Sequence, residues 1–241
     1  MVRFTLFGVP VEIQPWFWLS AALFSGTLES LSPDAMQYGL IFVLAATLSI
    51  LVHEFGHALT GLRLGGGRAN IVLWFFGGLA YNQGGRFTKS GHFWRIAAGP
   101  GAGFVLGGLV FLIMVAIFGL QDAARLAGVS LFGLDINLAS LSPDTLVFVA
   151  TRLRLMSLFH SMLEINFWWG VINLLPVLPL DGGQIAKLFV TPQKKVHQIA
   201  MVTAAATAVV ALLWRGSMFM PLMFGYLAWK NYKDMKEYHW Q

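Results

Sequence analysis

The sequence contains no cysteine and few charged residues. Without cysteine, the chain forms neither a disulfide nor a thiolate metal site. Charged residues make up 11% of its 241 residues and hydrophobic residues 57%, whereas a soluble domain carries about a quarter charged residues. A soluble globule of this composition would expose large apolar patches. The composition therefore predicts an integral membrane protein.

The sequence also lacks a basic block and a signal peptide. Basic residues outnumber acidic ones by 16 to 11, but the densest local group is the pair Lys194–Lys195, so we expect no nucleic-acid partner. The N-terminal stretch MVRFTLFGVPVEIQPW is interrupted by Pro10, Glu12 and Pro15 and has no small-residue cleavage site. Membrane insertion is therefore expected to use an uncleaved first helix.

Six apolar segments are candidates for transmembrane helices, each of which needs about 20 apolar residues. They predict an all-α polytopic membrane protein with about six transmembrane helices. The expected spans lie near residues 16–31, 38–63, 94–120, 160–180, 196–214 and 216–230. The intervening loops are too short for an additional soluble domain, so we expect one integral-membrane domain over residues 1–241. The fourth span has a long approach, and residues 145–175 are long enough for one continuous helix.

One uncharged stretch is not expected to span the membrane. Residues 69–85, ANIVLWFFGGLAYNQGG, contain the pair Gly77–Gly78 and end in Asn, Gln and two glycines. β-Branched and aromatic residues around a glycine pair are typical of a strand–turn–strand. We therefore predict a small membrane-associated β-hairpin. Because an open sheet edge is not tolerated in lipid, protein must cover it or it must line a polar cavity.

The charged residues predict the orientation of the spans. The loops near 63–95 and 183–195 and the C-terminal tail are basic, whereas the loops near 32–37 and 121–144 are mainly acidic. Basic loops face the cytoplasm. The pattern predicts a multi-pass protein of the cell membrane with both termini in the cytoplasm.

The apolar stretch ILVHEFGHAL contains two histidines and a glutamate. On a helix, His53 and His57 share one face, so both imidazoles can bind one metal ion, and Glu54 lies close enough to act on a water. The alternatives are a chance match or histidines that hydrogen-bond to neighbouring helices. Ionisable groups within a membrane span are costly and usually functional, which favours the metal site.

Asp181 is the best candidate for a third metal ligand. A catalytic zinc site uses three protein ligands and one open position, and cysteine is absent. Asp181 lies in NLLPVLPLDGG, at the predicted cytoplasmic end of the fourth span, where Pro176 and Pro179 prevent a regular helix. Unwound backbone is acceptable in a membrane where it lines a cavity. The alternative is an ordinary helix terminus with an exposed aspartate.

The remaining histidines have simpler explanations. His160 and Glu164 lie four residues apart and could form a second metal pair, but an interhelical hydrogen bond, or a place at the membrane interface on the long fourth helix, is favoured. No ligand role is needed for His92, His197 or His239. The small residues of AAGPGAGFVLGG, residues 97–108, predict close helix packing.

Together, HEFGH, the GPGAG helix and NLLPVLPLDGG resemble the site-2 protease family of intramembrane zinc metalloproteases. The resemblance is to the compact type without PDZ or CBS domains. It implies one Zn²⁺ per chain, held by His53, His57 and Asp181, with Glu54 as general base and Asn173 near the scissile carbonyl or its oxyanion. It also implies that the hairpin receives a transmembrane substrate as an added strand in the lipid bilayer, with the active site toward the cytoplasm.

Two other functions use the same residues. A divalent-metal transporter would need further ionisable residues along a path, and often an internal repeat; the sequence has neither. A catalytically inactive membrane binding protein would usually have lost Glu54 or a ligand. The sequence specifies neither a regulatory membrane partner nor a homo-oligomer.

Overall fold

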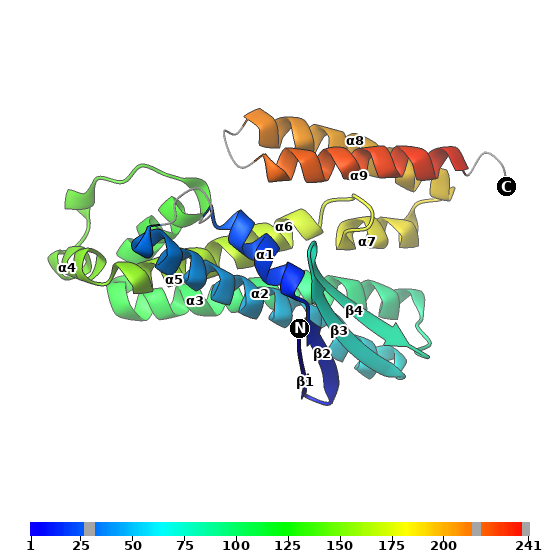
Figure 1. Cartoon of the computed structure of the whole chain (residues 1–241), viewed down its shortest axis with the longest axis horizontal. Helices are drawn as coiled ribbons and strands as arrows, with labels where there is room; N and C mark the ends of the chain where they lie inside the picture. Colours follow the sequence, from blue (N-terminus) through cyan, green and yellow to red (C-terminus); the bar gives the residue numbers. More distant parts are fainter. Residues whose placement is uncertain (27–31, 214–217, 238–241) are drawn as a thin grey trace. The chain divides into compact units, whose positions relative to one another are not determined.

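The computed structural model describes residues 1–26, 32–213 and 218–237. The chain divides into two compact units. The first unit contains Met1–Arg86 and Ala98–Gly170, and the second contains Phe87–Ala97 and Val171–Gln241. Figure 1 follows the chain through both.

The first unit begins with strands that the sequence analysis missed. A four-stranded sheet has the order β1-β2-β3-β4, from β1 (Val2–Leu6) through β2 (Val9–Ile13) and β3 (Arg68–Trp74) to β4 (Gly77–Gln83). The pairs β1–β2 and β3–β4 are antiparallel, whereas β2 and β3 are parallel. The predicted hairpin is therefore one half of a larger sheet. The parallel pair could not be predicted locally, because its partners are about 60 residues apart and their pairing depends on the helices between them.

One face of this sheet is buried against helices. Alternate residues of β2 and β3 face inward, as expected for a sheet with one covered face. They form a core with residues of α1 (Pro15–Phe24) and α2 (Pro33–Gly65). The buried members of this core are Val9, Val11, Ile13, Phe17, Ile50, Phe55, Ala58, Ala69, Ile71 and Leu73.

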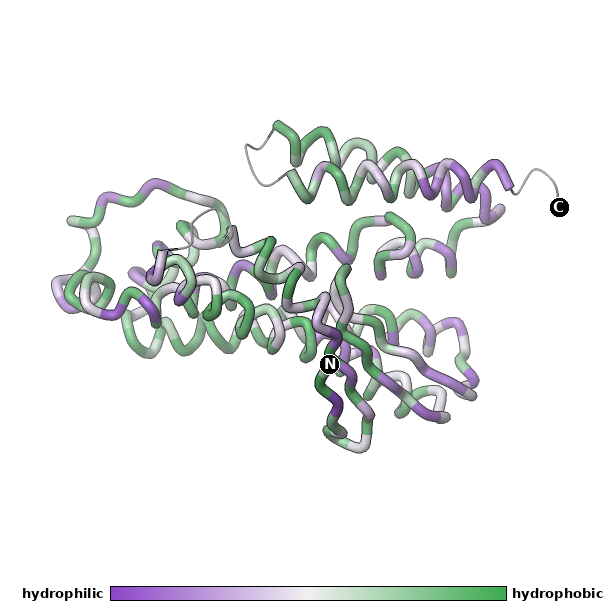
Figure 2. Tube along the Cα trace, viewed as in Figure 1, coloured by the Kyte–Doolittle hydropathy of each residue, from purple (hydrophilic) through white to green (hydrophobic). Residues whose placement is uncertain are grey.

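The helix α2 has clear signals at both ends. The Ser32 hydroxyl accepts the Ala35 N–H at 3.2 Å, and Pro33 occupies the first helical turn, where its missing N–H costs nothing. The helix ends before Gly66, whose φ of 69° suits glycine. These signals fix a 33-residue apolar helix, and hydrophobic residues make up much of its trace in Figure 2.

The third helix extends beyond its predicted end. α3 (Lys89–Phe132) contains a non-helical residue, Gly119, with φ 77° and ψ 161°. The chain turns there and resumes a helix, so the first part of the predicted loop 121–144 is helical. Glycine allows this backbone conformation without steric cost.

The approach to the fourth span is broken. α4 (Pro143–Thr151) meets α5 (Leu153–Glu164) at a bend of 95°, because Arg152 has non-helical φ and ψ of −123° and 43°. The predicted continuous helix over 145–175 is therefore wrong. After α5, a π-helical segment (Ile165–Trp169) and α6 (Gly170–Asn173) continue the helix, which ends at Asn173.

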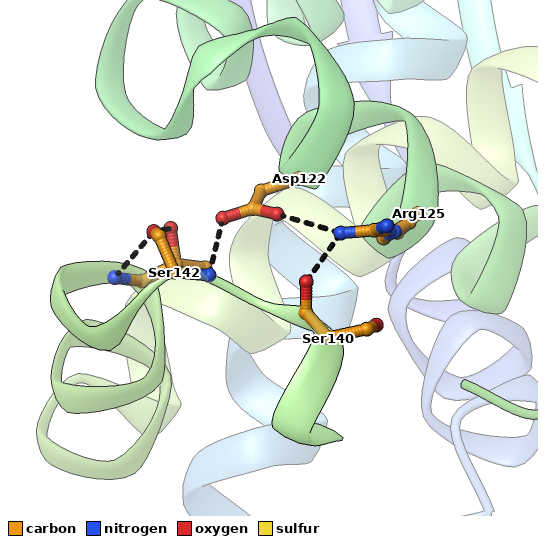
Figure 3. Close-up of polar contacts among 5 residues, drawn as sticks. Asp122, Arg125, Ser140 and Ser142 are labelled. Carbon is orange, nitrogen blue, oxygen red and sulfur yellow. Dashed lines mark hydrogen bonds and ion pairs between the residues drawn. The ribbon is translucent and has the colours of Figure 1, made fainter. Parts of the chain in front are cut away.

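A polar cluster holds this bend to α3. Asp122 Oδ2 accepts the Ser142 N–H at 2.9 Å, and the Arg125 guanidinium donates to Asp122 Oδ1 at 3.3 Å and to the Ser140 carbonyl (Figure 3). Ser142 is also the N-cap of α4, because its hydroxyl accepts the Thr145 N–H. The cluster therefore fixes where α4 begins.

The second unit is helical. Residues 174–180 form no helix, as Pro176 and Pro179 predict, and are followed by α7 (Asp181–Phe189), α8 (Gln193–Leu213) and α9 (Phe219–Glu237). α8 and α9 lie side by side and antiparallel (Figure 1). Figure 2 shows that the C-terminal half of α9 is hydrophilic. The buried core of this pair contains Val177, Ala204, Phe224 and Leu227.

Three described helices, α2, α3 and α8, are long and apolar enough to cross a membrane, and the bent pair that starts at α4 makes up to four. α1 has only ten residues, and residues 27–31 of the first predicted span lie outside the described part of the chain. Residues 214, 216 and 217 of the last two predicted spans also lie outside it. The full set of six spans stays a prediction.

Candidate active site

The residues HEFGH, 53–57, form one buried turn of the helix α2. His53, Glu54 and His57 are exposed by only 3%, 4% and 8%, although isolated ionisable groups are expensive to bury. Their helix packs against the sheet and the π-helical segment of the first unit. Because buried polar groups are costly, the burial of all three indicates that they form a functional site.

The two imidazoles present their Nε2 atoms to each other. The distance between His53 Nε2 and His57 Nε2 is 3.1 Å, and the ring planes meet at 79°. Two nitrogens bound to one tetrahedral zinc at about 2.0–2.1 Å would lie about 3.3 Å apart. A hydrogen bond between the rings has a similar length, so the distance alone permits both arrangements.

The backbone of α3 faces these nitrogens without a side chain between them. A Cβ added at Gly99 would collide with His57 Nε2 and come within 2.8 Å of His53 Nε2. Close by, a Cβ at Gly56 would collide with the carbonyl of Ala98. Glycine therefore keeps the space beside both donor atoms open. Two buried imidazole nitrogens that converge on a space kept free of side chains fit a zinc ion.

The start of β4 lies against Glu54. A Cβ added at Gly78 would collide with the Glu54 carboxyl group, and one at Gly77 would lie 2.6 Å from Trp169 Cζ2. β4 is an edge strand of the sheet. Strand backbone therefore adjoins the candidate general base.

Asp181 and Asn173 belong to the second unit. Asp181 is the first residue of α7, and Asn173 is the last residue of α6 and is buried. Arg95, at the start of α3, interacts electrostatically with Asp181. The structure thus brings His53, Glu54 and His57 together within the first unit, whereas the approach of Asp181 and Asn173 to them stays a prediction.

Glycines tie Asp181 to the unwound segment before it. A Cβ at Gly182 would collide with the backbone of Leu174 and Leu175, and one at Gly183 would come within 2.6 Å of the Val177 backbone. The first turn of α7 therefore packs directly on the backbone of residues 174–178. This contact explains why two glycines follow Asp181.

The other sequence candidates have different surroundings. His160 Nε2 lies 3.3 Å from Glu164 Oε2, and both side chains are nearly half exposed, so the two residues pair along one helix and not between helices as expected. His239 lies outside the described residues. His197, for which no role was predicted, is buried and lies 3.2 Å from Asn231 Oδ1. Sequence reasoning also missed Asn231, whose only signal is an amide directly after the apolar part of α9.

The apolar helices, the small sheet and the buried histidine pair define a membrane protein of the metallopeptidase class. The model of peptidase family M50 matches residues 41–213, more than two thirds of the chain. The chain therefore belongs to peptidase family M50, the site-2 protease family.

Two curated relatives are similar to this chain. A zinc metalloprotease of Methanocaldococcus jannaschii is 24% identical over 93% of this chain and 53% of its own length. A Synechocystis protein, whose name marks it as a candidate zinc metalloprotease, is 30% identical over 77% of this chain and 43% of its own length. The chain thus spans about half the length of these relatives.

A solved structure shares the fold. The site-2 protease from Methanocaldococcus jannaschii superposes with a TM-score of 0.55 at 20% identity. The match covers 97% of this chain and 94% of that one. The fold described above is therefore that of a site-2 protease.

Proposed function

We propose that this protein is an intramembrane zinc metalloprotease that hydrolyses a peptide bond in or near a transmembrane segment of a membrane-protein substrate. The observation that carries the proposal is the pair of buried Nε2 atoms, 3.1 Å apart on an apolar helix. Glu54 lies between the two histidines in the sequence, and the glycine face of α3 adjoins their nitrogens. Membership of peptidase family M50 supports the reaction class.

His53, His57 and Asp181 would hold one zinc ion per chain, leaving one position open. When bound, zinc acts as a Lewis acid that makes water more acidic and polarises a peptide carbonyl. Two neutral imidazoles and one carboxylate form a common donor set for zinc. Asp181 fits this role because α7 begins with it and the glycines after it fix that turn on the preceding segment.

Glu54 would serve as the general base. Its carboxylate takes the proton of the water that attacks the scissile carbonyl carbon, and the carbon–nitrogen bond then breaks. Glu54 returns this proton to the departing amine, so the protons balance over the cycle. Burial beside β4 leaves the Glu54 carboxylate few competing water contacts, which favours proton transfer at this atom.

Asn173 would stabilise the negative oxygen of the tetrahedral intermediate. Its side-chain amide can donate a hydrogen bond to that oxygen, and loss of one such donor typically lowers kcat about 100-fold or more. Asn173 ends α6, eight residues before Asp181, the first residue that follows the unwound segment. Asn173 and Asp181 would therefore flank the reacting carbonyl from two ends of one loop.

The substrate would bind along β4. A transmembrane helix hides its carbonyls, so the substrate must unwind before cleavage, and pairing with a strand edge replaces its backbone hydrogen bonds. β4 forms an edge of the sheet, and its first residues lie against Glu54. The partner is therefore a membrane protein in the lipid bilayer, with the site toward the cytoplasmic surface, where the basic loops are expected.

Zinc content and peptide cleavage together test the proposal. In detergent or vesicles, wild type is expected to bind one zinc and cleave a model single-span substrate. Glu54→Gln should lower cleavage by about 10²- to 10⁴-fold and keep its zinc. The matched control is Glu164→Gln, which changes the half-exposed carboxylate beside His160 and should leave cleavage unchanged.

Two outcomes would contradict the proposal. Equal cleavage by wild type and Glu54→Gln would remove the assigned base. Zinc uptake into vesicles by wild type and by Glu54→Gln, without cleavage by either, would instead support a metal transporter.

A further inference from the structure

We propose that Asn231 and His197 position the unwound segment that leads to Asp181. Both residues lie in the second unit, on α9 and α8, and neither belongs to the motifs that identify the family. The inference rests on the proposed role of Asp181 as a metal ligand. It assigns to the paired helices α8 and α9 the task of fixing that ligand.

Asn231 binds the backbone of the unwound segment. Its Nδ2 donates to the Leu178 carbonyl at 2.8 Å and to the Leu227 carbonyl at 2.8 Å. The side chain is completely buried. The Leu178 carbonyl lies between Pro176 and Pro179, in a segment without helical hydrogen bonds, and a buried carbonyl without a partner is costly. Asn231 therefore supplies a hydrogen bond that the prolines prevent the segment from making as a helix.

His197 fixes the orientation of the Asn231 amide. His197 Nδ1 lies 3.2 Å from Asn231 Oδ1. The two carbonyl partners of Nδ2 fix the orientation of the amide, and an amide oxygen can only accept, so the contact with Oδ1 requires the His197 proton on Nδ1. A flipped amide would place Oδ1 against two carbonyl oxygens and is disfavoured. The imidazole thus ensures that Nδ2 faces Leu178.

Apolar contacts fix the same segment on either side of this hydrogen bond. Val177 packs with Ala204, Phe224 and Leu227, and Leu178 packs with Val196 and Ala200. These side chains hold the segment on α8 and α9 but leave it free to slide or rotate slightly, because apolar packing is weakly directional. The hydrogen bond from Asn231 is directional, so it fixes one position of the segment on α8 and α9.

The position of the segment determines the position of Asp181 through the first turn of α7, which contains Gly182 and Gly183. Gly183 lies in close contact with the backbone of Val177 and Leu178, and Gly182 with that of Leu174. No side chain separates the first turn of α7 from the segment, so a shift of Leu178 moves the turn that begins with Asp181. Asn231 and His197 are therefore positioning residues that act through the backbone of residues 174–180.

The first test measures hydrogen exchange in metal-free protein, so it does not depend on zinc or cleavage. In Asn231→Leu, the amides of residues 174–184 should exchange about 10-fold faster than in wild type, whereas those of α2 should not change. Lys230→Gln, at the exposed neighbouring position, is the control. Unchanged exchange in residues 174–184 of folded Asn231→Leu would overturn the inference.

The second test uses two conservative replacements of His197. His197→Asn keeps a donor near the place of Nδ1, whereas His197→Gln moves the donor toward the place of Nε2. Zinc affinity, measured by competition with a chelator, should stay within about 3-fold of wild type in His197→Asn. It should fall by about 10- to 100-fold in His197→Gln, the range typical of residues that orient metal ligands. Gln198→Ala, exposed on α8, is the control.

The outcomes separate this inference from the proposed function. Wild-type protein that binds no zinc would contradict the proposed metal site, but faster exchange in Asn231→Leu would still support the positioning of the segment. Zinc binding by wild type together with equal affinities of His197→Asn and His197→Gln would overturn the positioning role and leave the protease assignment intact. If Asn231→Leu fails to fold, the comparison of His197→Asn with His197→Gln still tests the inference.

Discussion

The two units provide their parts of the proposed site in different ways. In the first unit, three functional groups occupy one turn of a continuous helix, and the geometry of that helix alone sets their spacing. In the second unit, the candidate ligand follows seven residues without helix, and its position depends on glycine contacts and on Asn231, 50 residues further along the chain. The local sequence thus determines the geometry of a regular helix, whereas distant residues determine the geometry of an unwound segment.

The largest expected loss of zinc affinity comes from adding a side chain at Gly99, where the backbone of α3 faces the two histidines. Gly99→Ala places a methyl group against both Nε2 atoms, so both imidazoles would have to turn away from their present positions. We expect zinc affinity to fall by about 100-fold or more, since even indirect disturbance of metal ligands costs about 10- to 100-fold.

Chelator competition measures this loss, and Gly101→Ala is its control. Gly101 lies two residues further along α3, and a Cβ there would have no neighbour within 4 Å. If Gly99→Ala bound zinc as tightly as Gly101→Ala, the histidine nitrogens could not face α3 as described.

The corresponding change in the second unit should have a smaller effect. Gly182→Ala forces the first turn of α7 away from the Leu174 and Leu175 carbonyls, but residues 174–180 can adjust. We expect zinc affinity to fall by about 10- to 100-fold, less than for Gly99→Ala. Isothermal titration of zinc into both variants gives the comparison.

The control for this change is Gly225→Ala on α9, where a Cβ meets nothing within 4 Å. An effect of Gly182→Ala larger than that of Gly99→Ala would reverse the contrast between the two units. It would show that the unwound segment is the more rigid half of the site.

The smallest effect is expected far from the metal ligands, in the cluster of Figure 3. Ser142→Ala removes the hydroxyl that caps α4, which typically costs about 1 kcal/mol. The unfolding temperature should fall by about 2–4 °C, with zinc affinity unchanged. Ser90→Ala, at an exposed position, should change neither, and a loss of zinc affinity in Ser142→Ala would link the bend at Arg152 to the site.

Features set by local chemistry could be predicted from the sequence. The approach of His53 to His57 follows from the helical repeat, and Pro176 and Pro179 mark the unwound segment before Asp181. The two strands within residues 69–85 were likewise expected, although Gly77 and Gly78 begin β4 and do not form the turn. In each case the residues that decide the structure are close together in the chain.

Features set by distant partners could not be predicted. β1 and β2 pass unnoticed because Pro10 and Glu12 interrupt their apolar pattern, and only the pairing of β2 with β3 makes them part of a sheet. The bend at Arg152 depends on residues that tie α4 to α3. Asn231 resembles any polar residue at the end of an apolar helix until its bond to Leu178 is seen.

The crossing of α2 and α3 has a mechanical consequence. At Gly56 and Gly99 the two helices touch through backbone, and the imidazoles themselves form part of the contact. No side chain of α3 separates its backbone from the imidazoles at Gly99, so a small displacement of α3 there would shift the nitrogen donors directly. In the proposed protease, lateral pressure or a change in bilayer thickness that displaces α3 would therefore change the zinc affinity of the histidines, and lipid composition should change the rate of cleavage without altering any reacting group.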